Sequence, residues 1–139
     1  DLEVGLDPMM YFDLRDPKST YPPELPPYRK GAYGYHDDSL LSINTIWSQR
    51  DYVLDRCHTL AHQVPGASTL FVNYQTATKA LNDGVNFAET LKQYDMRVAI
   101  WTVDVKNDEA LPMSRRLHDV GFEMFISNTP IALAKALNE

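Results

Sequence analysis

The part of the chain from residue 39 onward alternates short apolar runs with segments of helical spacing, and this alternation constrains the fold most. Apolar runs predict strands at residues 39–44, 69–74, 96–103 and 122–127. Strands that alternate with helices of this length form parallel sheets covered by helices. The near-continuous apolar runs RVAIWTV and FEMFIS are typical of strands buried on both faces.

Capping residues, prolines and glycines mark where the intervening helices begin and end. They predict a helix after Ser48 that stops before Pro65, a helix in two pieces that breaks near Asp83-Gly84 and ends around Tyr94, a helix from Pro112 to Gly121, and a last helix beginning at Pro130.

Residues 1–38 have a different composition, with six of the nine prolines. The run PMMYFDLRDP, Pro8 to Pro17, predicts one short strand, and a long loop rich in proline and tyrosine follows it. Together with residues 39–139, this predicts a single α/β domain over residues 1–139. The predicted fold is a partial (β/α) TIM-barrel-like parallel sheet with about five strands.

The gross composition excludes some classes of protein. Thirteen basic against 19 acidic residues give a net charge of −6, which argues against a nucleic-acid groove lined with Lys and Arg. No apolar run is long enough for a transmembrane segment. The single cysteine, Cys57, excludes an internal disulfide, so both a secreted and a cytoplasmic location stay open.

Polar side chains follow every predicted strand, at the ends where parallel sheets bind their ligands. They are Asp13, Arg15 and Asp16; Asn44; Asn73, Tyr74 and Gln75; Trp101, Thr102 and Asp104; and Ser127, Asn128 and Thr129. Such a rim could hold a hard cation through carboxylates and a phosphate through an arginine. For any one residue a structural role is favoured, because these residue types also cap helices. Trp101 argues most for a pocket, because a buried indole N–H needs a partner.

Several of these segments resemble a known family. VAIWTVD (98–104) and VGFEMFISNTP (120–130) resemble the last two strands of the glycerophosphodiester phosphodiesterase family, which has phospholipase-D-like relatives of the venom type. MMYFDLRDP resembles the fourth strand of that barrel, LSINT the fifth and TLFVNY the sixth. The resemblance covers nearly the whole chain, but only the C-terminal half of a barrel that takes roughly 250 residues.

The resemblance implies a metal-dependent phosphodiester hydrolase with Mg²⁺ or Ca²⁺ and a small phosphodiester or lysophospholipid-like substrate. Asp13 would be the metal ligand, and Arg15 and Trp101 the catalytic residues, with Trp101 also walling the pocket. Arg15 replaces a lysine of the family, and because guanidinium stays protonated it is not expected to donate a proton. The candidate substrate-binding residues at the other strand ends are Tyr74, Asp104 and Asn128.

The family's catalytic histidines, one in a His-Arg-Gly motif, and its Glu-x-Asp metal pair belong to the first half of the barrel, and neither motif occurs here. We therefore expect the isolated chain to be weakly active or inactive. A missing N-terminal half, or a second copy that pairs with an open sheet edge, would be the partner. The alternative is a non-catalytic α/β binding or assembly module derived from the same fold.

Two histidine groups lie outside these motifs. His58 and His62 have the i, i+4 spacing that can chelate zinc. A solvated helix face is the favoured interpretation, because the pair has no obvious third ligand. His36, with Asp37 and Asp38, could form a lid over the strand ends, although a solvent-facing loop is favoured.

Overall fold

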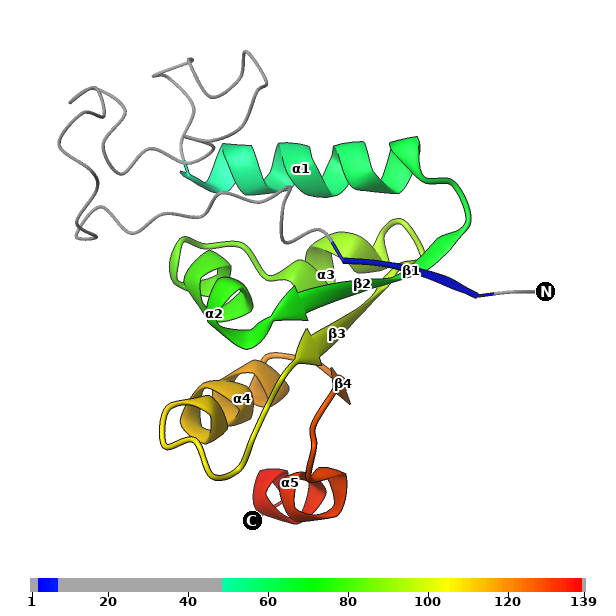
Figure 1. The fold of residues 1–139 in the computed structure, drawn as a ribbon. Coiled ribbons are helices and arrows are strands. Elements are labelled where there is room, and N and C mark those ends of the chain that lie inside the picture. The colour runs from blue at the N-terminus through cyan, green and yellow to red at the C-terminus, as the bar shows by residue number, and fades with distance from the viewer. Residues whose placement is uncertain (1–2, 8–48, 139) are drawn as a thin grey trace, which may run out of the picture.

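The computed structural model describes residues 3–7 and 49–138, which form an α/β fold built on a parallel sheet (Figure 1). Its strands pair in the order β1-β2-β3-β4, and every neighbouring pair is parallel. This confirms the predicted fold class. The elements are β1 (Val4–Leu6), α1 (Gln49–Gln63), β2 (Ala67–Asn73), α2 (Tyr74–Asn82), α3 (Phe87–Lys92), β3 (Arg97–Trp101), α4 (Ala110–Asp119), β4 (Met124–Phe125) and α5 (Pro130–Leu137).

The centre of the sheet is the pair β2 and β3. Leu70 lies beside Val98, and Val72 beside Ile100. Side chains alternate between the two faces of a strand, so these four aliphatic residues point to one face. All four are buried, and burying each stabilises the fold by about 1.5 to 3 kcal/mol relative to leaving it in water.

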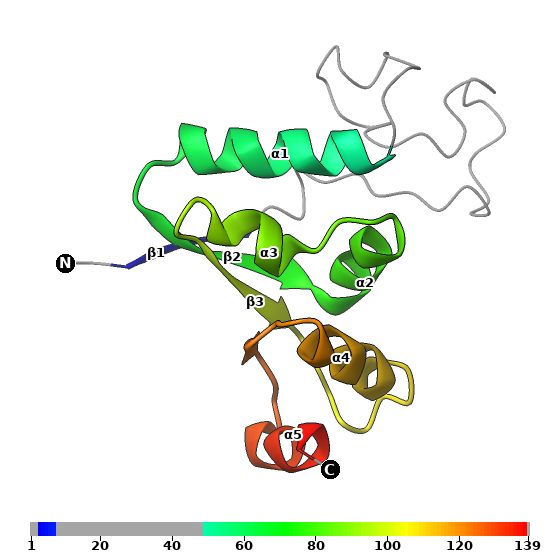
Figure 2. The ribbon, with the colours of Figure 1, turned by 180° about the vertical axis from the view of Figure 1, so that it is seen from behind.

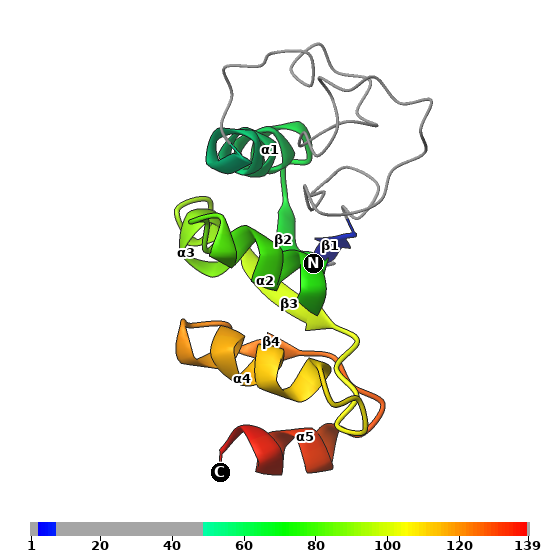
Figure 3. The ribbon, with the colours of Figure 1, turned by 90° about the vertical axis from the view of Figure 1, so that its left-hand side faces the viewer.

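The helices form one layer over that aliphatic face. Figure 3 shows α2, α3 and α4 on the same side of the strands. At the ends of the layer, α1 packs against α3 and α5 packs against α4. Figure 2 shows α1 alongside α3 from behind. The chain therefore runs through successive β/α units that lie side by side, as in one part of a (β/α) barrel.

The opposite face of the sheet carries larger and more polar side chains. Phe71 and Trp101 are half-buried there, and the exposed Arg97 donates to the carboxylate of Glu3 at 3.0 Å. Within the part of the chain that the structure describes, no helix packs on this face. In a closed barrel, this face would form the interior.

Helix α4 begins at Ala110, so the expectation that Pro112 opens it is wrong. The Asn107 carboxamide oxygen accepts the backbone N–H groups of Glu109 and Ala110 at 3.0 and 3.3 Å, which starts the helix earlier. Pro112 then falls in the first turn, where its missing N–H has no intrahelical partner to lose. The helix ends as predicted near Gly121, which has φ +97°.

Two strands are shorter than predicted. β3 spans Arg97–Trp101 rather than residues 96–103, and β4 spans only Met124–Phe125 rather than residues 122–127. Irregular pairing continues beyond them, because Ile126 N–H donates to Ile100 O and Val103 N–H donates to Ile126 O. The end of β4 is therefore attached to the sheet without regular strand geometry.

Strand β1 was missed from the sequence, because three residues that include a glycine give almost no periodic signal. It pairs with β2, whose other edge pairs with β3, so both edges of β2 are occupied. The sequence placed a strand at residues 39–44 immediately before β2 in the barrel. In the structure, β1 takes that position. The predicted strands at residues 9–14 and 39–44 lie outside the described residues.

Gly5 allows β1 to approach β2 closely, and this contact can be tested. A Cβ atom on Gly5 would lie 2.1 Å from Cε2 of Phe71. We expect Gly5→Ala to lower the free energy of unfolding by about 1 to 3 kcal/mol, as overpacking does. Urea titration measures the change. In a Phe71→Leu background the same substitution should cost less, and an equal cost in both backgrounds would contradict the contact.

Cys57 gives a second test of the core under α1. Burial raises the pKa of its thiol from 9.0 to about 12. Because the pKa is raised in the folded state, the associated stability is complete below pH 9.0 and is lost as the pH rises toward 12. Since the thiolate is the nucleophile, iodoacetamide at pH 8 should alkylate the native chain far more slowly than the urea-unfolded chain. Similar rates by mass spectrometry would rule out a buried Cys57.

Candidate functional site

The carboxyl ends of the two central strands bring Asn73 and Trp101 together. These residues end β2 and β3 and are direct neighbours in the parallel register. Figure 1 shows both arrowheads reaching the same edge of the sheet, beside α2 and the segment that leads to α4. We call this the carboxyl edge. It is where the sequence predicted a site.

Trp101 has the least satisfied polar group of this edge. Its side chain is half-buried, but its Nε1 atom is inaccessible to solvent and has no hydrogen-bond partner among the described residues. A buried donor without a partner costs about 1 to 3 kcal/mol. The indole N–H is therefore available to an acceptor that the described residues do not supply.

Asn73 and Tyr74 are used largely by the fold itself. The Asn73 carboxamide accepts the N–H of Gln75 at 2.8 Å, so the residue that ends β2 also caps α2. Tyr74 is the first residue of α2 and belongs to the hydrophobic core, with 7% of its surface exposed. Its hydroxyl accepts a long hydrogen bond of 3.4 Å from Asn107 Nδ2. The ring of Tyr74 therefore belongs to the core, and only its hydroxyl group lies at the carboxyl edge.

The other two candidate substrate-binding residues lie in turns. Asp104 is half-buried and accepts the N–H of Lys106 at 2.9 Å, which closes the turn after β3. Asn128 is exposed in the turn before α5. There the hydroxyl of Ser127 accepts the N–H of Thr129 at 2.9 Å, whereas Thr129 makes no side-chain cap of the helix. Asn128 therefore has a solvent-facing position just beyond β4.

The remaining candidates, Asp13 and Arg15, lie outside the described residues, as do His36 and its two neighbouring aspartates. Among residues 3–7 and 49–138, no three His, Cys, Asp or Glu side chains gather as ligands for a metal ion. The described part of the carboxyl edge thus contributes Asp104 as a carboxylate and Trp101 as a donor.

Asn107 is a residue of this edge that the sequence analysis did not select. Its oxygen caps α4 while its nitrogen donates to Tyr74, so one side chain joins α2, α4 and the turn after β3. An Asn shortly before an apolar helical run is a cap signal, which the sequence did contain. Asn107 and Tyr74 are far apart in the chain, so no local sequence pattern predicted their contact.

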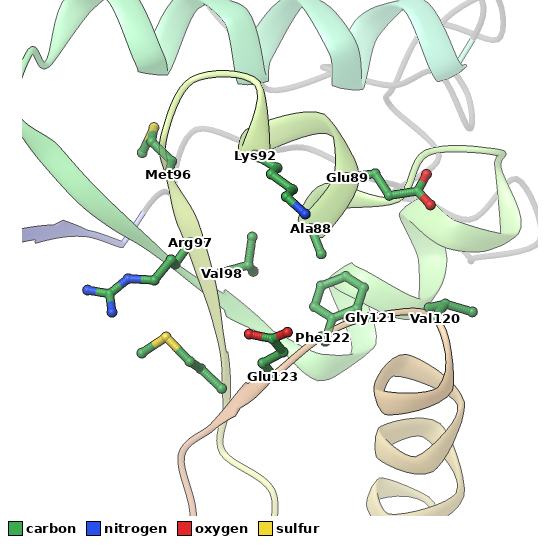
Figure 4. Close-up of a pocket in the computed structure, with 11 residues that line it drawn as sticks. Ala88, Glu89, Lys92, Met96, Arg97, Val98, Val120, Gly121, Phe122 and Glu123 are labelled. Atoms are coloured by element: carbon green, nitrogen blue, oxygen red, sulfur yellow. The ribbon is translucent and has the colours of Figure 1, made fainter.

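A pocket of about 370 Å³ lies at the opposite end of the strands, which we call the amino edge (Figure 4). Figure 4 shows Lys92 on α3 and Glu123 in the segment before β4 among the residues that line it, together with apolar groups that include Val98 and Phe122. The sequence analysis missed this pocket, because it forms where residues 88–98 meet residues 120–124, which are distant in the chain. In barrels the amino edge usually serves stability.

Comparison of the chain with models of protein families, with curated proteins and with solved structures finds no match. Within the described residues, none of the helices has the length and apolar character needed to cross a membrane.

Asn107 and Tyr74 allow the structural role of this edge to be measured. We expect Asn107→Ala to lower the free energy of unfolding by about 1 to 2 kcal/mol, because α4 loses its cap. Tyr74→Phe removes only a long hydrogen bond and should cost about 0.5 kcal/mol or less. Urea unfolding compares both with Asn128→Ala, a change of an exposed Asn in the turn before α5. An Asn107→Ala variant as stable as this control would disprove the capping role.

Proposed function

We propose that this chain is the C-terminal half of a metal-dependent phosphodiester hydrolase of the glycerophosphodiester phosphodiesterase type. The observation that carries the proposal is the position of Trp101 at the carboxyl edge of a sequential parallel sheet, where its indole N–H has no partner among the described residues. Ligands of parallel (β/α) folds bind at that edge. The motif VAIWTVD, on which the family resemblance rests, is the segment that ends there.

The order of the strands supports a barrel over other parallel folds. The sheet follows chain order from β1 to β4, and its helices form one layer on one face. A doubly wound sheet instead reverses its strand order and carries helices on both faces. The four strands of the described residues are half of the eight in a complete barrel, so in the proposed enzyme a second half would supply the other strands.

In the proposed enzyme, Trp101 walls the substrate pocket and donates its indole N–H to an oxygen of the phosphodiester or its glycerol. Such a donor stabilises charge that develops on the phosphoryl oxygens. Asp104 and Asn128 would contact polar groups of the substrate, and the Tyr74 hydroxyl would fix the turn that carries Asp104 through Asn107. Arg15 would hold the phosphate bidentately.

The proposed divalent ion, Mg²⁺ or Ca²⁺, needs several oxygen ligands. The described residues do not gather such a set, so they do not fit a Mg²⁺ or Ca²⁺ centre by themselves. The ligands would have to include Asp13 and carboxylates of the other half of the barrel. We therefore assign no step of the reaction through the ion to the described residues.

A second candidate function is a non-catalytic α/β binding or assembly module derived from the same fold. The side chains of Asn73, Asp104 and Asn107 all accept backbone N–H groups of their own turns and helices. Because these polar atoms hold local turns and helices in place, fewer polar groups of the carboxyl edge are available to bind or activate a substrate. This use of the polar residues is the observation that supports the module as the second candidate.

A reconstituted phosphodiesterase assay separates these functions. Hydrolysis of a glycerophosphodiester and of a lysophospholipid would be measured with Mg²⁺ or Ca²⁺, for the chain alone and mixed with a half-barrel that carries the His-Arg-Gly and Glu-x-Asp motifs. We expect little or no activity from the chain alone and metal-dependent hydrolysis from the mixture. Equilibrium dialysis measures binding of the same substrates.

Trp101→Phe keeps an aromatic ring and removes the indole N–H. In the active mixture it should lower kcat by about tenfold or more, the effect of one lost hydrogen bond at a buried site. Tyr52→Phe, an equally conservative change on α1, should leave kcat unchanged. Substrate binding without hydrolysis would favour the module, and the absence of both would rule out both functions.

A further inference from the structure

Helix α1 and the turn after α3 bring two histidines and a tyrosine together. The rings of His58 and His62 have centroids 4.1 Å apart, on consecutive turns of one face of α1. Both rings contact the ring of Tyr94 edge-on, with centroid distances of 5.9 and 5.7 Å. Tyr94 therefore packs against both imidazoles and limits their motion.

The Nδ1 atoms of both His58 and His62 take part in hydrogen bonds. The Nδ1–H of His62 donates to the carbonyl oxygen of His58 at 2.8 Å. Because a carbonyl only accepts, the neutral His62 ring carries its lone pair on Nε2. His58 Nδ1 shares a hydrogen bond of 3.0 Å with the Tyr94 hydroxyl. When that nitrogen donates, the Nε2 of His58 also carries a lone pair.

We propose that His58 and His62 form a binding site for a transition-metal dication, with Tyr94 as the residue that orients His58. Imidazole nitrogen is a preferred ligand of Cu²⁺, Ni²⁺ and Zn²⁺. Histidines that bind metals usually donate their other ring N–H to a protein oxygen, which fixes the ring and raises its basicity. Both rings of this pair have such an oxygen partner, the carbonyl of His58 and the hydroxyl of Tyr94.

The site is open, with two protein ligands and water in the remaining positions. Within the described residues, no third His, Cys, Asp or Glu joins the pair. The adjacent Cys57 is fully buried on the core face of α1, so its sulfur is directed away from both exposed rings. Structural zinc sites have four protein ligands. This site should therefore bind its ion reversibly and exchange it with solvent.

The site is separate from the proposed phosphodiesterase site. His62 lies at the end of α1 that leads into the start of β2, and Tyr94 lies just before the start of β3. Both therefore belong to the amino edge, whereas Trp101 ends β3 at the carboxyl edge. Figure 2 shows the end of α1 and the turn between α3 and β3 at the same side of the molecule.

Isothermal titration of the full chain with CuCl₂, NiCl₂ and ZnCl₂, in a buffer that does not bind metals, tests the proposal. We expect saturable binding of one ion, tightest for Cu²⁺ as the general order of divalent affinities requires. Tyr94→Phe should weaken binding by roughly tenfold, as loss of an outer-shell partner does. His58→Gln and His62→Gln should each weaken it further, because each removes a ligand.

His118→Gln is the matched control, because His118 is also exposed and helical but, within the described part of the chain, has no second histidine beside it. It should leave the affinity unchanged. Circular dichroism and the unfolding midpoint would show that each variant folds. Line broadening of imidazole resonances by Ni²⁺ should identify residues 58 and 62. Absence of saturable binding, or unchanged affinity in His58→Gln and His62→Gln, would overturn the proposal.

Discussion

The parallel pairing of β2 with β3 is the interaction on which the rest of this structure depends. It runs without interruption from Thr69 beside Arg97 to Asn73 beside Trp101. The flanking strands are attached to this pair by shorter and less regular contacts, with a bulge in β1 and two residues in β4. The pair also presents the aliphatic face that the helices cover. If its register shifted by one residue, the aliphatic residues would turn away from the helices and Trp101 would no longer lie beside Asn73.

Much of this core could be predicted, because β2, β3 and the helices between them have strong local signals. Continuous apolar runs marked the two strands, and Pro130 marked the first residue of α5. The misses have a different physical origin. β1 forms because it pairs with β2, and Gly5 leaves room for the ring of Phe71. Neither contact can be predicted from a local sequence pattern. In the same way, Asn107 could be recognised as a cap but not as a partner of Tyr74.

The sequence could locate the strand ends of the candidate site, but not how the polar atoms there are used. Strand ends could be located from the sequence, and Trp101 does lie at the carboxyl edge. Short polar side chains bind nearby backbone groups readily, however, and Asn73 and Asp104 do so here. An indole has no comparable local partner. The Trp101 indole N–H therefore has no partner among the described residues, whereas the side-chain oxygens of Asn73 and Asp104 accept backbone N–H groups.

The carboxyl edge and the amino edge are far enough apart that the proposed phosphodiesterase site and the proposed histidine site cannot share one metal ion. β3 has five residues, and at a rise of about 3.3 Å per residue its first and last residues lie about 13 Å apart. A metal ion on His58 and His62 could not touch a substrate beside Trp101, because metal–ligand bonds span only about 2 Å. If hydrolysis depends on a metal, that dependence should survive the loss of both histidines. The hydrolytic ion would then belong to the carboxyl edge, where the other half of a barrel would supply its ligands.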